Sequence, residues 1–202
     1  HRFNILYEYA DSAPMRITSN FSTYEPFDGK SMNFTSQRKR DGDVFEEIRG
    51  GANVAEDGSA KAVFTVPSDL EFDLPAGTLF PLAHSMEVVK KIREGQKFHS
   101  ATIFDGSDED GPVSVTAFIG KPAFPVQEKI DNPAIDQTLL ASPAHDVRLA
   151  FFPLLEQEET SDYEMNLVMH ENSLFSDMVI EYDDFTVAQN LVAVEPIADG
   201  CQ

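Results

Sequence analysis

Apolar and polar residues alternate with a period of two along most of the chain, which predicts a mainly β protein. In the segment 15–24, for example, Met15, Ile17 and Phe21 fall on one face and polar side chains on the other. Strands of this kind are expected at 3–9, 15–24, 31–39, 44–54, 60–66, 70–74, 98–104, 113–119, 147–152, 163–169, 174–182 and 185–194. Many short strands with regularly spaced turns are typical of a barrel, a sandwich or a coiled open sheet.

The turns between the first strands predict how these strands are connected. Asp28-Gly29, Asp41-Gly42 and Asp57-Gly58 each separate two patterned segments of similar length, which is the pattern of an antiparallel meander. Gly50-Gly51, inside the segment 44–54, indicates a bulge or sharp bend. β and α patterns do not alternate, so a parallel sheet is not expected.

One amphipathic helix interrupts the strands, at about residues 81–94. Pro81 suits the first helical turn, and Gly95 is a natural C-terminal stop. The predicted apolar stripe consists of Leu82, Met86, Val89 and Ile92. Glu87 and Lys91 lie four residues apart on the opposite, solvated face. A short stripe with a mixed polar face favours a helix that packs on an open sheet over a membrane or partner helix.

The domain organisation follows from the absence of a linker between two patterned halves. We therefore expect one β domain over residues 1–202. The proline-containing stretch 120–143 has no clear period and is too long for an ordinary loop, so we expect it to be mobile, to bind a partner, or both. The joint between Ala13 and Pro14 is abrupt, and we expect residues of the natural chain to be missing there.

Composition allows a large core and excludes several partners. The apolar fraction is 42%, and 16 Phe residues supply much of it. The formal net charge is −20, and a surface this acidic repels nucleic acid and anionic lipid headgroups. We expect no membrane insertion, because no run approaches the ~18 apolar residues that a spanning helix needs. The chain starts at His1 without Met, so we expect that an upstream segment was removed.

Candidate chemical motifs give no active site. The acidic turn 105–111 resembles a calcium loop, but the sixth and twelfth positions counted from Asp105 are Asp110 and Thr116, where an EF-hand needs Gly and Glu. A solvated hairpin tip is the better interpretation. His170-Glu171 lacks the second His of a zinc-protease motif. His84 is interpreted as a buried structural residue.

No nucleophile elbow, phosphate-binding loop or dinucleotide fingerprint is present. We therefore predict no catalytic, cofactor-binding or metal-binding residues, no cofactor and no enzymatic activity. Any enzyme would need histidines and carboxylates clustered in one cleft, with perturbed pKa values.

Several motifs together resemble the EipB-type cell-envelope integrity proteins, the DUF1849 domain family. They are LPAGTLFPLAHSM, the helix, FDGSDEDG, FIGKP and the hairpin YEMNLVMHENSLFSDMVIEYDDF, over about residues 74–121 and 147–195. The resemblance implies a long antiparallel meander curled into a β-spiral, an open barrel-like sheet with one packed amphipathic helix. It also implies an exported periplasmic protein of alphaproteobacteria that resists envelope stress through protein contacts. The implied partner is a periplasmic tetratricopeptide-repeat protein, and a homodimer is expected.

Two departures from the family's pattern lead to further expectations. The family usually has two cysteines joined by a disulfide, and Cys201 matches only the second. We expect Cys201 to pair with a cysteine missing from this numbering, near residues 13–14. Such a bond closes a long loop and contributes about 3–5 kcal/mol. Asn172-Ser173 stands where the family favours Asn-Gly, and Ser tolerates a positive φ less well.

Two functions remain open at this point. The first is a non-catalytic scaffold for envelope integrity. The second is a periplasmic carrier of a lipid or other apolar ligand in a half-open β-barrel, because such barrels can hold one ligand. A carrier needs a continuous apolar cavity, whereas a sheet filled by its own Phe side chains and the helix leaves no room for one.

Overall fold

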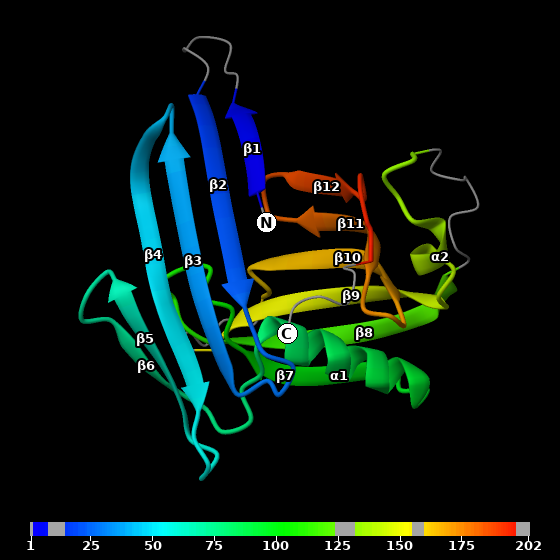
Figure 1. Cartoon of the computed structure of the whole chain (residues 1–202), viewed down its shortest axis with the longest axis horizontal. Helices are drawn as coiled ribbons and strands as arrows, with labels where there is room; N and C mark the ends of the chain where they lie inside the picture. Colours follow the sequence, from blue (N-terminus) through cyan, green and yellow to red (C-terminus); the bar gives the residue numbers. More distant parts are fainter. Residues whose placement is uncertain (1, 8–14, 124–131, 155–159, 197–202) are drawn as a thin grey trace. The chain divides into compact units, whose positions relative to one another are not determined.

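The computed structural model describes residues 2–7, 15–123, 132–154 and 160–196, and the predicted mainly β fold is confirmed (Figure 1). The described residues fall into two compact units, one within residues 1–84 and 102–113, the other within 85–101 and 114–202. The prediction of one domain over residues 1–202 stays a prediction.

Each unit is built on one six-stranded sheet in which neighbours in sequence are neighbours in space. The strands of the first sheet are β1 (Arg2–Tyr7), β2 (Met15–Tyr24), β3 (Ser31–Arg40), β4 (Asp43–Val54), β5 (Ala60–Val66) and β6 (Glu71–Leu74). Those of the second are β7 (Phe98–Ile103), β8 (Val113–Ala123), β9 (Ala144–Pro153), β10 (Tyr163–His170), β11 (Phe175–Glu181) and β12 (Thr186–Asn190). The helices are α1 (Pro81–Arg93) and α2 (Gln137–Leu140). Among the described residues, both sheets are therefore open meanders with two edges each, as the resemblance implies for a coiled open sheet.

Local sequence signals explain the turns and the bulge of the first sheet. Asp41 and Gly42 both have positive φ, 52° and 99°, which is the conformation that a two-residue hairpin turn requires. The β4–β5 pairing shifts register between Arg49 and Gly50, so the bulge predicted at Gly50-Gly51 is confirmed.

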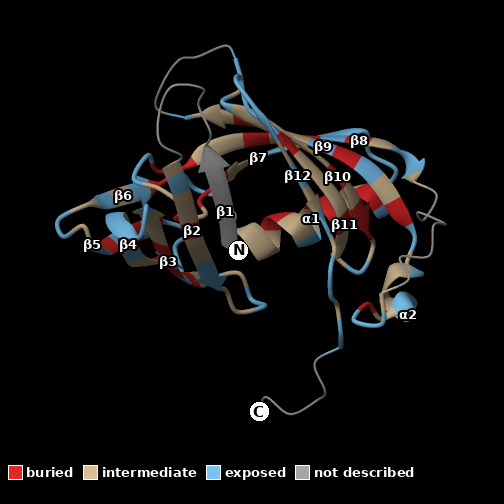
Figure 2. Cartoon of the chain, turned by 90° about the horizontal axis from the view of Figure 1, so that it is seen from above, coloured by how far each residue is buried: buried red, intermediate tan, exposed pale blue. Residues whose placement is uncertain are grey.

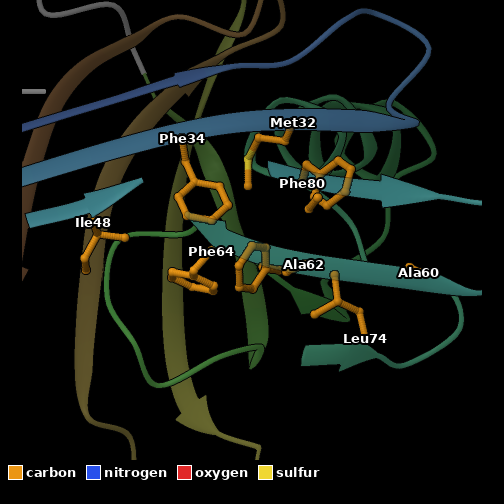
Figure 3. Close-up of a cluster of buried hydrophobic side chains, with 10 residues drawn as sticks. Met32, Phe34, Ile48, Ala60, Ala62, Phe64, Leu74 and Phe80 are labelled. Carbon is orange, nitrogen blue, oxygen red and sulfur yellow. The ribbon is translucent and has the colours of Figure 1, made fainter. Parts of the chain in front are cut away.

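Side chains from the first sheet and adjoining segments pack into a core rich in Phe (Figure 3). Phe34 of β3 is its centre and is 1% exposed. Its ring lies edge-to-face against Phe64 of β5 and Phe104, with centroids 5.0 and 5.6 Å away. The buried members of the cluster are Met32, Phe34, Ile48, Ala52, Ala60, Ala62, Phe64, Leu74, Phe80 and Phe104.

Two glycines allow the Phe34 ring to lie directly against the backbone. A Cβ at Gly50 would lie 2.4 Å from Phe34 Cζ and 2.5 Å from the carbonyl oxygen of Val63. A Cβ at Gly106 would lie 2.4 Å from Phe34 Cγ. Any side chain at either position would collide with the ring, so both residues belong to the core although they contribute no apolar side chain.

The helix α1 packs on one face of the second sheet (Figure 2). Its Val88, Val89 and Ile92 are at most 6% exposed. The sheet residues of the same core cluster are Ala117, Ile119, Val147, Leu167 and Met169. The interpretation of α1 as a helix that covers an open sheet is confirmed.

The buried stripe of α1 is rotated from the predicted one. Met86, which was predicted to be in the stripe, is 46% exposed, whereas Val88 is 1% exposed. His84, Val88 and Ile92 form an i, i+4 row that is buried together with Val89. The prediction was right for Val89 and Ile92 and wrong for Met86, because the buried row runs through Val88 and His84, which the predicted stripe did not include.

Both ends of α1 are satisfied by hydrogen bonds. The Glu25 carboxylate, between β2 and β3, accepts bonds from the N–H groups of Leu82 and Ala83, at 2.7 and 2.8 Å. These are two of the donors that a helix N-terminus leaves unpaired. At the other end, the N–H of Gly95 donates to Ile92 O (3.0 Å) and that of Gln96 to Lys91 O (3.0 Å). This is a Schellman motif, and it confirms Gly95 as the stop.

The stretch 120–143 differs from the expected loop at both ends. β8 continues to Ala123, and α2 lies near the other end with Asp136 as its N-cap. Residues 132–136 also bond to the segment after β12, since Asp136 N–H donates to Val194 O (2.9 Å). Residues 124–131 lie outside the described residues, so the mobility expected of this stretch stays a prediction.

Candidate functional site

The acidic turn 105–111 is organised by its own side chains. Asp105 Oδ1 accepts a hydrogen bond from the N–H of Ser107 (2.9 Å), and Asp108 Oδ1 accepts one from the N–H of Asp110 (3.0 Å). Burial raises the pKa of the Asp105 carboxyl, and the bond from Ser107 opposes that shift. Carboxylates that cap their own backbone are what a tight turn needs, so a structural role agrees with these contacts. The prediction of a solvated tip was wrong for most of the turn, because Gly106 and Gly111 are buried and only Glu109 and Asp110 are exposed.

The histidines considered in the sequence occupy structural positions. His84 is 6% exposed in the first turn of α1, so its predicted burial is confirmed. His170 is 2% exposed at the end of β10. Its Nε2 lies 2.9 Å from Ser176 Oγ and its Nδ1 lies 3.2 Å from the carbonyl oxygen of Ser142. Both ring nitrogens of His170 are therefore engaged in holding β10, β11 and the segment before β9 together.

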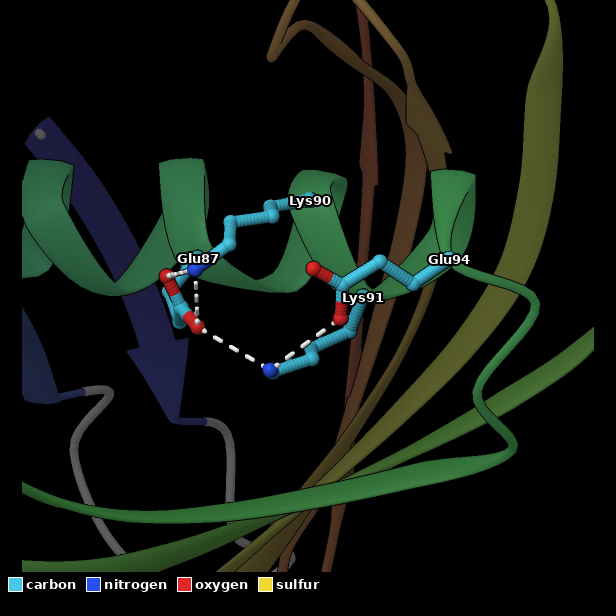
Figure 4. A network of polar contacts seen from close by, with 4 residues as sticks. All are labelled: Glu87, Lys90, Lys91 and Glu94. Atoms are coloured by element: carbon cyan, nitrogen blue, oxygen red, sulfur yellow. Dashed lines mark hydrogen bonds and ion pairs between the residues drawn. The ribbon is translucent and has the colours of Figure 1, made fainter.

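The polar face of α1 carries a four-residue ion-pair network (Figure 4). Glu87 lies 3.3 Å from both Lys90 and Lys91, and Lys91 lies 3.2 Å from Glu94. The predicted Glu87–Lys91 pair is thus confirmed. Because these groups are partly or fully exposed and balance one another, each pair contributes only about 0.3–0.5 kcal/mol. The network stabilises the helix and leaves no strong charge for a ligand.

A groove on the second sheet is the candidate binding site. It lies on the face opposite α1, has a volume of about 460 Å³ and is open to solvent. It crosses the strands β8, β9, β10 and β11. Its lining consists of Phe118, Ile119, Gly120, Asp146, Val147, Arg148, Asn166, Leu167, Val168, Asp177, Met178 and Val179. We call this surface the outer groove.

The strand registers decide which side chains of the outer groove face outward. On the paired strands β9 and β10, Val147 lies opposite Leu167, and both belong to the core under α1. Their neighbours Asp146 and Val168, which also lie opposite each other, therefore point to the other face. The groove is thus a row of outward residues, not an opening into the core.

Carboxylates dominate the charge of the outer groove. Asp146 and Asp177 both line it, and neither has an ion-pair partner among the described residues. The one cation of the lining, Arg148, is paired with Glu164 of β10. The groove is therefore an apolar floor with an excess of negative charge.

The outer groove was not predicted from the sequence. Its residues lie in predicted strands, but their assembly depends on how four strands are aligned, and alternation alone does not give register. Exposed Phe118, in a strand whose outward residues are otherwise small or polar, was the one signal available. Cys201 lies outside the described residues, as do residues 8–14, so the disulfide stays a prediction.

The comparisons with known proteins give the family. The family model described as EipB-like matches residues 1–198. The chain belongs to the EipB-like family. It is similar to the cell envelope integrity protein EipB of Brucella abortus (strain 2308), with 30% identity over 190 residues. That alignment covers 92% of this chain and 65% of the relative, so the chain spans about two thirds of that protein's length.

A solved structure supports the fold assignment. The crystal structure of a beta-barrel-like protein of the domain of unknown function DUF1849, from Brucella abortus, matches with a TM-score of 0.83 and 28% identity. The match covers 95% of this chain and 78% of that chain. The predicted resemblance to the DUF1849 family is thereby confirmed. Among the helices of the described residues, none is long and apolar enough to cross a membrane.

Proposed function

We propose that this protein maintains the integrity of a bacterial cell envelope as an exported, periplasmic, non-catalytic scaffold that acts through contacts with other proteins. The observation that carries the proposal is the family match over residues 1–198, together with a relative named for cell envelope integrity. Since the chain spans only 65% of that relative, the activity and partners of the whole protein belong to the proposal.

The structural use of three buried or partly buried polar groups supports a non-catalytic role. His170 holds three segments of the chain together, Glu25 caps α1, and Asp105 caps the turn that follows β7. A catalytic acid or base must instead present its polar atom to a substrate within hydrogen-bond reach. These three groups have protein partners that account for their burial.

Two features support protein contacts as the mode of action. Both sheets have open edges, which can accept a strand from another chain. The outer groove adds an exposed apolar surface. From the family resemblance, the partner we propose is a periplasmic tetratricopeptide-repeat protein, and self-association as a homodimer is the second form of contact.

One observation favours a second function, the transport of a lipid or other apolar ligand. The outer groove, at about 460 Å³, is within the size range of small-molecule sites. It is open rather than enclosed, however, and its unpaired Asp146 and Asp177 would lose water without compensation under an apolar ligand. We therefore rank the carrier below the scaffold.

The test is complementation of a deletion strain of the source bacterium. The strain is challenged with a detergent and with a large hydrophilic antibiotic, and it receives the gene with or without an export signal. We expect sensitivity on deletion and rescue by the exported form only. Rescue by the form retained in the cytoplasm would contradict the periplasmic role, and a deletion strain as resistant as the parent would contradict the function itself.

A further inference from the structure

We propose that the outer groove binds a positively charged amphipathic segment of a partner protein, with apolar side chains on the groove floor and Lys or Arg beside Asp146 and Asp177. The inference rests on the proposed function, because it assumes action through protein contacts. The inference specifies the surface on which the partner binds and the chemical character of the partner's segment.

The apolar surface extends beyond the groove itself. Phe118 is 51% exposed at the end of the groove, and Phe98 of β7 is 68% exposed. The side-chain bond between Ser100 and Thr116 (2.9 Å) and the bond from Ile119 N–H to Lys97 O (2.8 Å) fix the alignment of β7 with β8. That alignment places Phe98 directly opposite Phe118. Two exposed aromatic rings next to an apolar depression are typical of a protein interaction surface.

Gly120, two residues after Phe118 in β8, lines the outer groove without a side chain. A Cβ at this position would lie 2.9 Å from the carbonyl oxygen of Asp146 and 3.2 Å from its Cβ. The strands β8 and β9 therefore lie so close here that a side chain at position 120 would collide with Asp146, and the backbone of β8 itself lines the groove. Val168 and Val179, from β10 and β11, continue the apolar lining across the sheet.

The negative charge of the outer groove determines which kind of ligand it can bind. Asp146 and Asp177 have no cationic partner in the described part of the chain, and Arg148 is already paired with Glu164. Glu181 of β11 accepts a hydrogen bond from Asn166, which lines the groove, and adds a further negative charge. Anionic lipid or nucleic acid would be repelled, and a neutral ligand would bury carboxylates without partners. A Lys or Arg side chain pairs with them and also accelerates the encounter.

The dimensions fit a short segment. The groove crosses four strands, and three spacings between neighbouring strands of about 4.8 Å each give a length of about 14 Å. At about 1.5 Å per residue, a helix of about ten residues covers that length. Such a helix presents apolar residues at i, i+3, i+4 and i+7, which is a common mode of peptide recognition in grooves.

The direct test uses a synthetic helical peptide of Leu and Lys about 14 residues long, labelled with a fluorophore. Two matched peptides replace every Lys by Glu or every Leu by Ser. Fluorescence anisotropy with the folded chain is expected to give at least about tenfold weaker binding of the Leu-to-Ser peptide and no binding of the Glu peptide. Amide chemical shifts are expected to change around Phe118, Val168 and Val179.

Variants separate the groove from general attraction to an acidic protein. Phe118→Ser removes the exposed aromatic anchor, and the double variant Asp146→Lys/Asp177→Lys reverses the local charge. The matched control is Asp183→Lys/Asp184→Lys, which makes the same change in net charge at exposed residues outside the groove. We expect at least about tenfold loss for each groove variant and a change of less than about threefold for the control. Circular dichroism melts confirm that each variant folds.

Several results would overturn the proposal. They are the absence of binding at millimolar peptide, equal binding of the Glu peptide, equal losses in groove and control variants, and shift changes that map elsewhere. A dimer that the groove variants dissociate would assign the face to a second copy instead. In cells, groove variants that rescue the deletion strain fully would refute the groove while leaving the proposed function intact. A resistant deletion strain would refute the function whatever the peptide does.

Discussion

The contact between Gly106 and Phe34 gives a sharp test of the core of the first unit. In Gly106→Ala, the new Cβ would lie 2.4, 2.6 and 2.7 Å from three carbons of the Phe34 ring. The ring cannot withdraw easily, because Phe64 packs on it and Gly50 lies at its far edge. The matched control is Gly58→Ala, because Gly58 also has a positive φ, 84° against 68°, but has nothing within 4 Å of its ideal Cβ.

Both substitutions place Ala at a positive φ, and only Gly106→Ala also brings its Cβ into collision with the Phe34 ring. A non-glycine residue in the left-handed region costs about 1 kcal/mol, which is the destabilisation expected for Gly58→Ala. Overpacking of the core adds about 1–3 kcal/mol, so Gly106→Ala is expected to destabilise by about 2–4 kcal/mol. Urea unfolding followed by far-ultraviolet circular dichroism gives the two values, since the chain has no Trp. Equal destabilisation by the two substitutions would refute the packing described for Phe34.

Three further predictions concern stability. Ser173 has φ 69° in the β10–β11 turn, so Ser173→Gly is expected to raise the free energy of unfolding by about 0.5 kcal/mol, and a loss would contradict the strain. Burial raises the pKa of Asp105 above its ordinary value of 3.8. The contribution of this carboxyl to the free energy of unfolding is therefore most favourable below pH 3.8 and is lost as pH rises through the folded-state pKa. Asp105→Asn should be more stable than the parent at pH 7, and the difference in free energy of unfolding should vanish near pH 3. Glu25→Ala, which removes the acceptor for two helix N–H groups, should cost about 1 kcal/mol in thermal unfolding, and an unchanged Tm would argue against the cap.

The strands and the ends of α1 were predictable because local signals determine them. Alternation gave β2 and β5 with their observed bounds, and in β5 the buried and exposed residues alternate as the pattern predicts. Pro81 and Gly95 marked the limits of α1 through the backbone conformations that these residues favour. Signals of this kind act within a few residues and do not require knowledge of distant packing.

The remaining features depend on contacts between segments far apart in the sequence. Burial of His84 rather than Met86 depends on which sheet residues meet α1. The roles of Gly50 and Gly106 follow from the position of Phe34, which is distant from both in sequence. The outer groove requires the registers of four strands together, and register is set by pairing, which the pattern of a single strand does not contain.

The central claim is that this protein acts through protein contacts in the envelope. The most direct test is native mass spectrometry of the protein recovered without refolding from its own envelope fraction. We predict a complex with another protein, whose mass identifies it, or a bare dimer. A bound small molecule of lipid mass, released on activation in the gas phase, would contradict the scaffold function and favour the carrier.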